Sequence, residues 1–293
     1  MKKSIIPTLI MIVTIFSLTM CSRSANNAGP AGSQSLQIKG SDTMVNLGQA
    51  WAEGFTKDHP DANVAVTGGG SGTGIAALIN GTADICEASR AMDEKELKLA
   101  AEKGVSPREH IAALDGLAVI VHPSNPVSRL TLAQLRDIFM GTVTDWKAVG
   151  GIPGKIIILS REVNSGTHVF FKEHVLRMGN AKGPEEFAAS ALLLPSSQAI
   201  ADEVANNPQA IGYYGMGYIT LKQKVIAVAK TDQCSYMTPT VASVTDNSYP
   251  ISRPLYLYTN GEPKGLAKNF IDYVFSPAGQ FIVAQVEFVP MKR

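Results

Sequence analysis

The sequence has 293 residues, with 26 Lys and Arg against 25 Asp and Glu and a formal net charge of +1 at pH 7. Binding to the phosphate backbone of a nucleic acid needs a basic surface, and neither this balance nor any run of Lys or Arg supplies one. Nucleic acid is therefore excluded as a partner, and the length suffices for two modest lobes with separate cores.

The amino terminus has the pattern of an export signal. Residues 1–20 begin with two lysines and continue as an apolar run that is short for a membrane span. Segment 18–21 resembles the bacterial lipoprotein signal, in which a cysteine takes a diacylglycerol anchor, although Met20 stands where a small residue is usual. We expect a signal peptide over 1–20, a lipidated Cys21 opening a flexible tether over 21–35, and a place in the periplasm or at the cell surface. Cleavage elsewhere would give a soluble periplasmic protein.

Strand-like and helix-like segments alternate after the tether, which predicts an α/β fold. The first part of the chain predicts strands at 36–40, 63–67, 83–87 and 117–121, and helices at 45–57, 75–79 and 93–103. The first helix has one apolar face, formed by Val45, Gly48, Ala52 and Phe55. The remainder predicts strands at 155–159 and 210–214, and helices at 130–140, 169–177, 197–205 and 264–284, the last interrupted near Pro277.

The order of these elements predicts two lobes joined by two crossings of the chain. We expect 36–116 and 253–293 to form lobe I and 117–252 to form lobe II. A cleft between lobes connected in this way can close on a small ligand. The two tryptophans, Trp51 and Trp146, are expected in the cores.

The run 68–74, Gly-Gly-Gly-Ser-Gly-Thr-Gly, lies between a predicted strand and a predicted helix. Glycines let backbone N–H groups turn toward a ligand, hydroxyls add donors, and a helix start carries unpaired amides and the positive end of its dipole. The run therefore fits an oxyanion such as phosphate. It lacks the Gly-Lys-Ser/Thr of a nucleotide P-loop, and glycines that only make a sharp turn remain an equal alternative.

Three further segments place polar groups beside a predicted helix start or strand end. Arg161 lies four residues before the triplet Ser165-Gly166-Thr167, so a planar charged fork stands beside backbone amides. Ser41-Asp42-Thr43 joins the first strand to the first helix, and Ser89-Arg90 follows the third strand. Taken singly, the hydroxyls fit helix N-caps and Arg90 fits a solvated side chain, whereas the Arg161 segment favours ligand binding.

Together these segments resemble the periplasmic phosphate-binding proteins of ATP-driven phosphate import, the PstS-type family of class II solute-binding proteins. The motifs stand in the family's order, and the similarity extends to 130–139 and 210–213 and covers essentially the whole mature chain. The resemblance implies a two-lobed periplasmic-binding-protein (type II) fold, each lobe a mixed sheet flanked by helices. It also implies high-affinity binding of inorganic phosphate in the interlobe cleft and delivery to an ABC-type permease.

The resemblance also implies which residues bind the ligand. Matched motif by motif, they are Ser41, Asp42, Thr43, Ser71, Gly72 and Arg90 on lobe I, and Arg161, Ser165, Gly166 and Thr167 on lobe II. Arg90 departs from the pattern, because many relatives carry an Asp there that can accept the proton of monohydrogen phosphate. We expect Asp42 to be the acceptor here, with Arg90 and Arg161 neutralising the dianion. Glu162 is the second choice, although it is better suited to orienting Arg161.

Other interpretations stay open at this point. The ligand could be sulfate, arsenate, molybdate or another oxyanion. A secreted phosphatase or serine hydrolase would use Ser71 or Ser165 with His168, but we expect His168 to point to solvent from a first helical turn. A surface protein without a small ligand is the third class.

We expect no cofactor, no metal site and no catalytic residue, and a chain that acts as a monomer. The spacing of Cys86 and Cys234 fits no metal pattern. We expect both to be structural residues, and the sequence alone leaves a disulfide between them open.

Overall fold

The computed structural model describes residues 34–291. The predicted signal peptide, Cys21 and all but the last two residues of the predicted tether lie outside these residues. The first strand, β1 (Gln34–Gly40), begins two residues earlier than expected, so Gln34 and Ser35 belong to the strand and not to the tether. All of the described residues belong to one compact unit.

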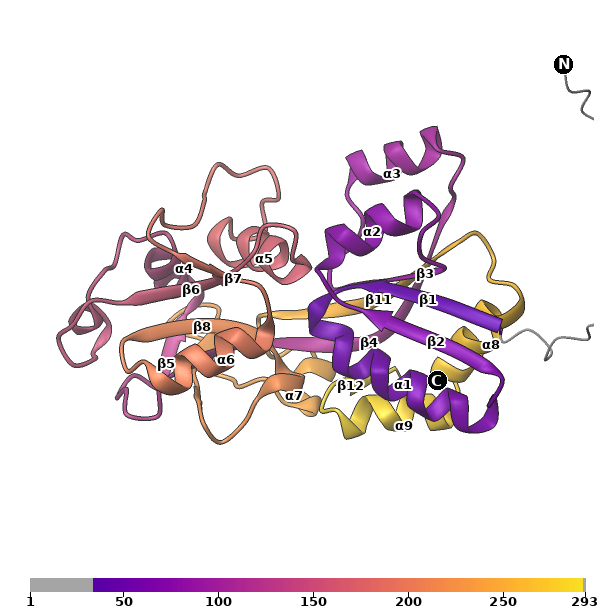
Figure 1. Ribbon diagram of the computed structural model, residues 1–293. Helices are drawn as coiled ribbons and strands as arrows, with labels where there is room; N and C mark the ends of the chain where they lie inside the picture. Colours follow the sequence, from indigo (N-terminus) through magenta and orange to yellow (C-terminus); the bar gives the residue numbers. More distant parts are fainter. Residues whose placement is uncertain (1–33, 292–293) are drawn as a thin grey trace, which may run out of the picture. The chain divides into compact units, whose positions relative to one another are not determined.

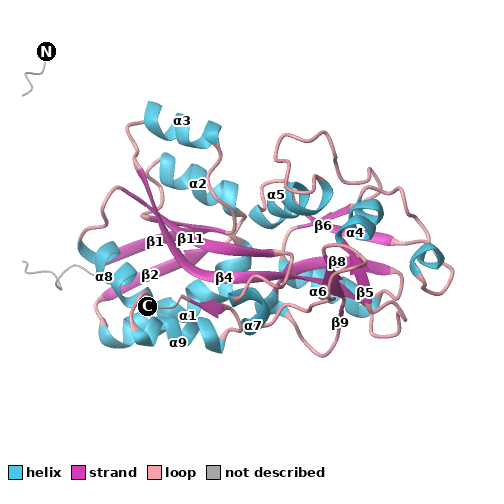
Figure 2. Ribbon diagram, turned by 180° about the vertical axis from the view of Figure 1, so that it is seen from behind, coloured by secondary structure: helices cyan, strands magenta, loops and turns pink. Residues whose placement is uncertain are grey.

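A mixed sheet runs through the described chain and helices cover both of its faces, which confirms the α/β prediction (Figures 1 and 2). Its main strand order is β2 (Ala62–Thr67), β1, β3 (Ile85–Ala88), β11 (Ser252–Asn260), β4 (Pro107–Val121), β8 (Ala210–Gly215), β6 (Ile157–Arg161) and β7 (Leu192–Leu194). The short strands β9 (Lys224–Val225) and β12 (Val289–Pro290) also pair with β4, whereas β5 (Arg129–Thr131) pairs with β10 (Ala227–Ala229).

The long strand β4 changes partners along its length. Residues 107–116 pair antiparallel with β11, and residues 117–121 pair antiparallel with β8. We call the parallel strands β1, β2 and β3 the first half of the sheet, and the strands β6, β7 and β8 the second half. The chain passes between the halves along β4 and again into β11, and the two passages touch where Leu117 N–H donates to the Ile251 carbonyl at 2.8 Å.

Five helices cover the first half: α1 (Val45–Asp58), α2 (Ser71–Ile79), α3 (Glu94–Glu102), α8 (Gly265–Val274) and α9 (Pro277–Gln285). The helices α2 and α3 lie on one face, and α1, α8 and α9 lie on the other (Figure 1). The predicted helix 264–284 is thus two helices. Ser276 caps the second one and Pro277 occupies its first position, where a missing N–H costs nothing.

Three helices accompany the second half: α4 (Leu132–Phe139), α5 (Gly166–Phe171) and α6 (Ser197–Asn206). The short helix α7 (Val241–Thr245) packs against β4 and β12. A π-helical turn, Lys172–Leu176, continues α5. Short 3₁₀ turns occupy Asp42–Met44, Trp146–Val149 and Met216–Tyr218. Within residues 34–291, no helix is both long enough and apolar enough to cross a lipid bilayer.

The buried face of α1 differs from the predicted one. Val45 is only half-buried, and the buried residues of this helix are Leu47, Gly48, Trp51, Ala52 and Phe55. The face is wider because α1 packs against both β2 and α9. Both tryptophans are core residues, as predicted, since Trp51 is fully buried and Trp146 is 1% exposed.

Candidate functional site

The three polar segments of the first half follow the carboxyl ends of parallel strands. Ser41, Asp42 and Thr43 follow β1, the glycine run follows β2, and Ser89 follows β3. Because these strands are parallel, their carboxyl ends meet at one edge of the sheet. That edge is where open α/β sheets bind ligands.

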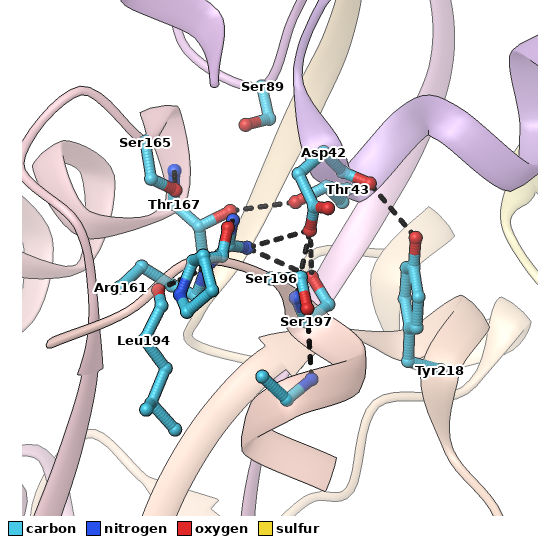
Figure 3. A network of polar contacts seen from close by, with 12 residues as sticks. Asp42, Thr43, Ser89, Arg161, Ser165, Thr167, Leu194, Ser196, Ser197 and Tyr218 are labelled. Atoms are coloured by element: carbon cyan, nitrogen blue, oxygen red, sulfur yellow. Dashed lines mark hydrogen bonds and ion pairs between the residues drawn. The ribbon is translucent and has the colours of Figure 1, made fainter. Parts of the chain in front are cut away.

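The fourth segment reaches the same place from the second half. Strand β6 ends at Arg161, and Ser165 is the N-cap of α5. The hydroxyl oxygens of Thr43 and Thr167 lie 2.8 Å apart across the two halves. Figure 3 shows hydroxyl side chains from both halves gathered near Asp42. The structure therefore brings all four predicted segments together.

The start of α2 makes direct contact with the second half. The helix begins four residues earlier than predicted, so Ser71 and Gly72 lie in its first turn. Gly72 N–H donates to the Asn164 carbonyl at 3.0 Å. The N-cap, Gly70, has a left-handed φ of 97°, and a Cβ there would lie 2.8 Å from the same carbonyl oxygen. The glycines thus allow a close approach between the halves as well as a turn.

Gly166 occupies an equally narrow space at the start of α5. A Cβ at this position would overlap Ser71 Oγ and lie 2.7 Å from Ser89 Oγ. Those two hydroxyl oxygens are themselves 3.3 Å apart, and Ser71 Oγ accepts from Ser89 N–H at 3.0 Å. Glycine is therefore required where α5 meets the serines of the first half.

Arg161 is a buried cation that the surrounding chain holds in place. Its Nη1 lies 3.1 Å from Asp42 Oδ2 and donates to Ser197 Oγ at 3.0 Å (Figure 3). Nε and Nη2 donate to the carbonyls of Leu194 and Pro195 at 3.3 and 2.8 Å. Because Arg161 and Asp42 belong to different halves, their ion pair joins the halves.

The carboxylate of Asp42 also lies at the start of α6. Its Oδ2 accepts from Ser197 N–H at 2.8 Å and from Ser197 Oγ at 3.1 Å, and the negative charge is favoured at a helix N-terminus. The Tyr218 hydroxyl donates to the Asp42 backbone carbonyl at 2.9 Å. Among residues 34–291, the polar groups that contact this carboxylate all reach Oδ2, and none reaches Oδ1.

Arg90 has a carboxylate partner of its own. Its two Nη atoms donate to the two oxygens of Glu96, each at 2.7 Å, as a bidentate pair. Burial lowers the pKa of Arg90, but the hydrogen bonds and charge of Glu96 offset this and raise it overall. The guanidinium lies beside Gly72, whereas contact with an anion stays a prediction. Glu162 is exposed, and Asp42 orients Arg161 in its place.

The expectation that His168 points to solvent is wrong. Its side chain is buried, and its Nδ1–H donates to the Arg161 carbonyl at 2.8 Å. The same nitrogen lies 3.2 Å from Ser160 Oγ. Burial lowers the pKa of His168 to about 4, so the imidazole is neutral at pH 7. Within residues 34–291, His168 has no hydrogen bond to Ser71 or Ser165, the pairing that a serine hydrolase would need.

A buried ion pair that the sequence did not reveal lies beside the four segments. Arg253 on β11 lies opposite Asp115 on β4, with Nη2 and Nε at 2.8 and 3.0 Å from Asp115 Oδ2. Burial lowers the pKa of Arg253, and the charge of Asp115 opposes that effect. Neither residue stands at a helix start, so only the strand pairing reveals them. Ser197 and Tyr218 were also missed, although Ser196-Ser197 has the composition of an N-cap.

The structure also bears on the two cysteines and on metal binding. Cys86 is buried and Cys234 is exposed, and both are free thiols, so they form no disulfide with each other. In the part of the chain that the structure describes, no group of three or more His, Cys, Asp or Glu side chains is placed to hold a metal ion.

The sequence of the chain matches a known family over most of its length. The family model described as a PBP superfamily domain matches residues 25–278. A relative named phosphate-binding protein PstS from Pseudomonas aeruginosa is 32% identical over 276 residues, which cover 88% of this chain and 84% of the relative. A protein of the same name from Bacillus subtilis is 31% identical over 308 residues, covering 99% and 95% of the two chains.

Solved structures of similar proteins share the architecture. A putative phosphate ABC transporter substrate-binding protein from Clostridium perfringens, solved with bound phosphate, has a TM-score of 0.79 and 32% identity, covering 88% of this chain and all (100%) of that one. An ABC-type phosphate transport receptor from Vibrio cholerae has a TM-score of 0.69 and 30% identity, covering 87% of this chain and 100% of that one.

Proposed function

The chain belongs to the PBP superfamily and, within it, to the family of phosphate-binding proteins named PstS, and from this premise we propose that it binds inorganic phosphate outside the cytoplasmic membrane and delivers it to an ABC-type permease. It is then the solute-binding component of a transporter and not an enzyme. One observation carries the proposal: four polar segments, distant in the sequence, meet between the two halves of the sheet.

The proposed anion ligands are hydroxyls, amides, guanidiniums and one carboxylate, that of Asp42, from both halves. They are Ser41, Asp42, Thr43, Ser71, Gly72, Arg90, Arg161, Ser165, Gly166 and Thr167. Three guanidiniums lie in or beside this set, and each already has a carboxylate partner: Asp42, Glu96 and Asp115. Their formal charges sum to zero, so a bound dianion would be compensated mainly by O–H and N–H donors and by the positive end of α2.

We also propose the lobe boundaries and the mode of binding. The fold is the two-lobed type II fold, and we assign 36–116 with 253–293 to lobe I and 117–252 to lobe II. The change of partner along β4 between residues 116 and 117 supports this division. Phosphate would lie between the lobes, and the Arg161–Asp42 pair would hold them closed around it.

Competition for radiolabelled phosphate on the purified protein tests the ligand. Arsenate, which carries a proton as phosphate does near neutral pH, is expected to displace the label. Sulfate and molybdate, without such a proton, would leave an acceptor carboxylate facing an unprotonated oxygen and are expected to displace it poorly. Displacement by sulfate at concentrations similar to those of phosphate would contradict the proposal and favour a different oxyanion.

The acceptor for the phosphate proton is proposed to be Asp42 Oδ1. Asp42→Asn replaces an acceptor-only carboxylate with an amide that can also donate, and so should lower phosphate affinity while raising that of sulfate. The change also weakens the contacts to Arg161 and Ser197, so Ser197→Ala is the matched control: it removes one donor to the same carboxylate and leaves the acceptor. If Asp42→Asn preserves the preference for phosphate over sulfate, the acceptor is another group.

The proposed location follows from the amino terminus. We propose that Cys21 is lipidated, that 21–33 form the tether from the membrane, and that the protein works as a monomer. Changing Cys21 to Ala should move the protein from the membrane fraction to the soluble fraction of the cell envelope. An unchanged distribution would contradict the anchor without affecting the assignment of the ligand.

A further inference from the structure

The buried pair of Arg253 and Asp115 lies where the chain passes between the two halves. The two residues are direct partners in the antiparallel register of β11 and β4, and they are 2% and 0% exposed. Asp115 Oδ2 accepts from Arg253 at 2.8 and 3.0 Å, and Oδ1 accepts from Met216 N–H at 3.0 Å. Both carboxylate oxygens are therefore engaged, and the guanidinium is held in one orientation.

The remaining donors of Arg253 reach the polar segments of both halves. Nη1 donates to the Ser89 carbonyl at 2.9 Å. Nη2 donates to Thr167 Oγ1 at 2.9 Å and lies 3.5 Å from Thr43 Oγ1. The ring of Phe170 covers the guanidinium, with its centroid 5.5 Å from Cζ. Arg253 thus lies directly behind the hydroxyl pair that joins the halves.

The chemistry of these groups limits how the two hydroxyl protons can be used. A guanidinium only donates, so Thr167 Oγ1 accepts from it and must use its own proton elsewhere. The two threonine oxygens are 2.8 Å apart, so one hydroxyl donates to the other. The pair has two hydroxyl protons, and the hydrogen bond between the two hydroxyls uses one of them, so one proton is left over. That proton is available to an anion on the side away from Arg253.

We propose that Arg253 is a positioning residue for the anion, which turns the Thr43–Thr167 hydroxyl pair into a hydrogen-bond donor directed at bound phosphate. The inference rests on the proposed function and adds a residue outside the ten assigned to the ligand. Because Asp115 neutralises the charge of Arg253, Arg253 contributes to anion binding by orienting the hydroxyls and not by its net charge. Without the guanidinium, the proton not used within the pair could point to the position that Arg253 occupies, and the pair would present only lone pairs to the ligand.

The test measures the effect of Arg253→Lys on phosphate affinity in the parent protein and in the T43V/T167V variant. Arg253→Lys keeps the charge but removes the planar fork, and it should weaken phosphate binding about 10- to 100-fold, the worth of a hydrogen bond to a charged group. In the T43V/T167V background, which has no hydroxyls to orient, the same change should alter affinity by no more than about twofold. An equal loss in both backgrounds would overturn the inference, because a merely structural role does not depend on the hydroxyls.

A second comparison is used if R253K fails to fold, as judged by the loss of cooperative unfolding. T43S/T167S keeps both hydroxyls and should bind phosphate at least about tenfold more tightly than T43V/T167V, since only the serine variant offers the donor. Equal affinities of these two variants would overturn the inference. A parent protein that binds no phosphate would overturn the proposed function as well, so the two failures are distinguishable.

Discussion

Glu87 is a buried carboxylic acid in the first half of the sheet. It is 1% exposed, and neither of its side-chain oxygens has a hydrogen-bond partner among residues 34–291. A Cβ at Gly48 would overlap its Oε1, so the glycine inside α1 makes room for this carboxyl at a cost of about 1 kcal/mol relative to Ala. The Glu87 carbonyl accepts from Ser41 N–H at 2.8 Å, which places the acid directly below the first polar segment.

Burial raises the pKa of Glu87 to about 8 in the folded protein. Between its unfolded pKa of about 4.3 and pH ~8, the acid is ionised in the unfolded chain and protonated in the fold, so folding takes up a proton. The free energy of unfolding should therefore fall as pH rises, by up to about 1.4 kcal/mol per pH unit. Glu87→Gln has no proton to lose, so its unfolding free energy should fall less over this range. Urea unfolding at pH 5, 6.5 and 8 measures the difference, and parallel pH profiles would show that Glu87 is already ionised in the fold.

At this scale the sequence indicated the hydroxyl and glycine residues but not their partners. Ser71, Gly72 and Thr167 were found because each stands beside a helix start, a local pattern. Arg253 and Asp115 lie within strands, where nothing local marks them, and 138 positions separate them. His168 was misjudged because burial of a first-turn residue depends on what packs over it, here Phe187 at a ring distance of 4.6 Å.

Among the elements, the starts of α2 and α5 bring the two halves into contact. Replacing Gly166 with Ala would place a methyl group against the hydroxyls of Ser71 and Ser89. Overpacking of this kind costs about 1–3 kcal/mol, so phosphate affinity should fall about 5- to 150-fold because the halves close incompletely. Calorimetric titration of the variant measures the loss.

The matched control for this prediction is Gly183→Ala in the second half. Its added methyl group would meet chiefly the end of the Glu185 side chain, which can move away, and the residue lies outside the proposed ligand set. The control should bind phosphate as the parent does. Similar losses in the two variants would mean that the G166A effect is a general loss of stability and not a block to closure.

The elements differed in how well the sequence predicted them. The capped helices α3, α4 and α6 were predicted nearly in full, as with α3, where Asp93 and Glu96 form a capping box. The short helix α7 was missed although Thr240 and Ser243 also form a capping box. The strand β11 was missed because Pro254 interrupts it and its apolar pattern is short. Only residues 117–121 of β4 were predicted, because the charges of Arg108, Glu109 and Asp115 hide the strand character of 107–116.

For the whole molecule, the α/β class and the family followed from the order of motifs along the chain. Two crossings of the chain between lobes were also expected, but the pairings of β4 with β11 and β8 were not, because they join residues distant in the sequence. The contacts across the halves, such as Asp42 with Arg161 and Thr43 with Thr167, depend on these pairings. The proposed lobe boundaries stay a prediction.

The central claim is selective binding of one phosphate between the two halves. Calorimetric titration of the purified protein, stripped of bound anion, with phosphate and then sulfate at neutral pH tests it most directly. We expect one-to-one phosphate binding with a dissociation constant of about 1 μM or below, a binding free energy of at least about 8 kcal/mol in magnitude, unaffected by excess sulfate. Preference for sulfate, or no heat of binding with either anion, would contradict it.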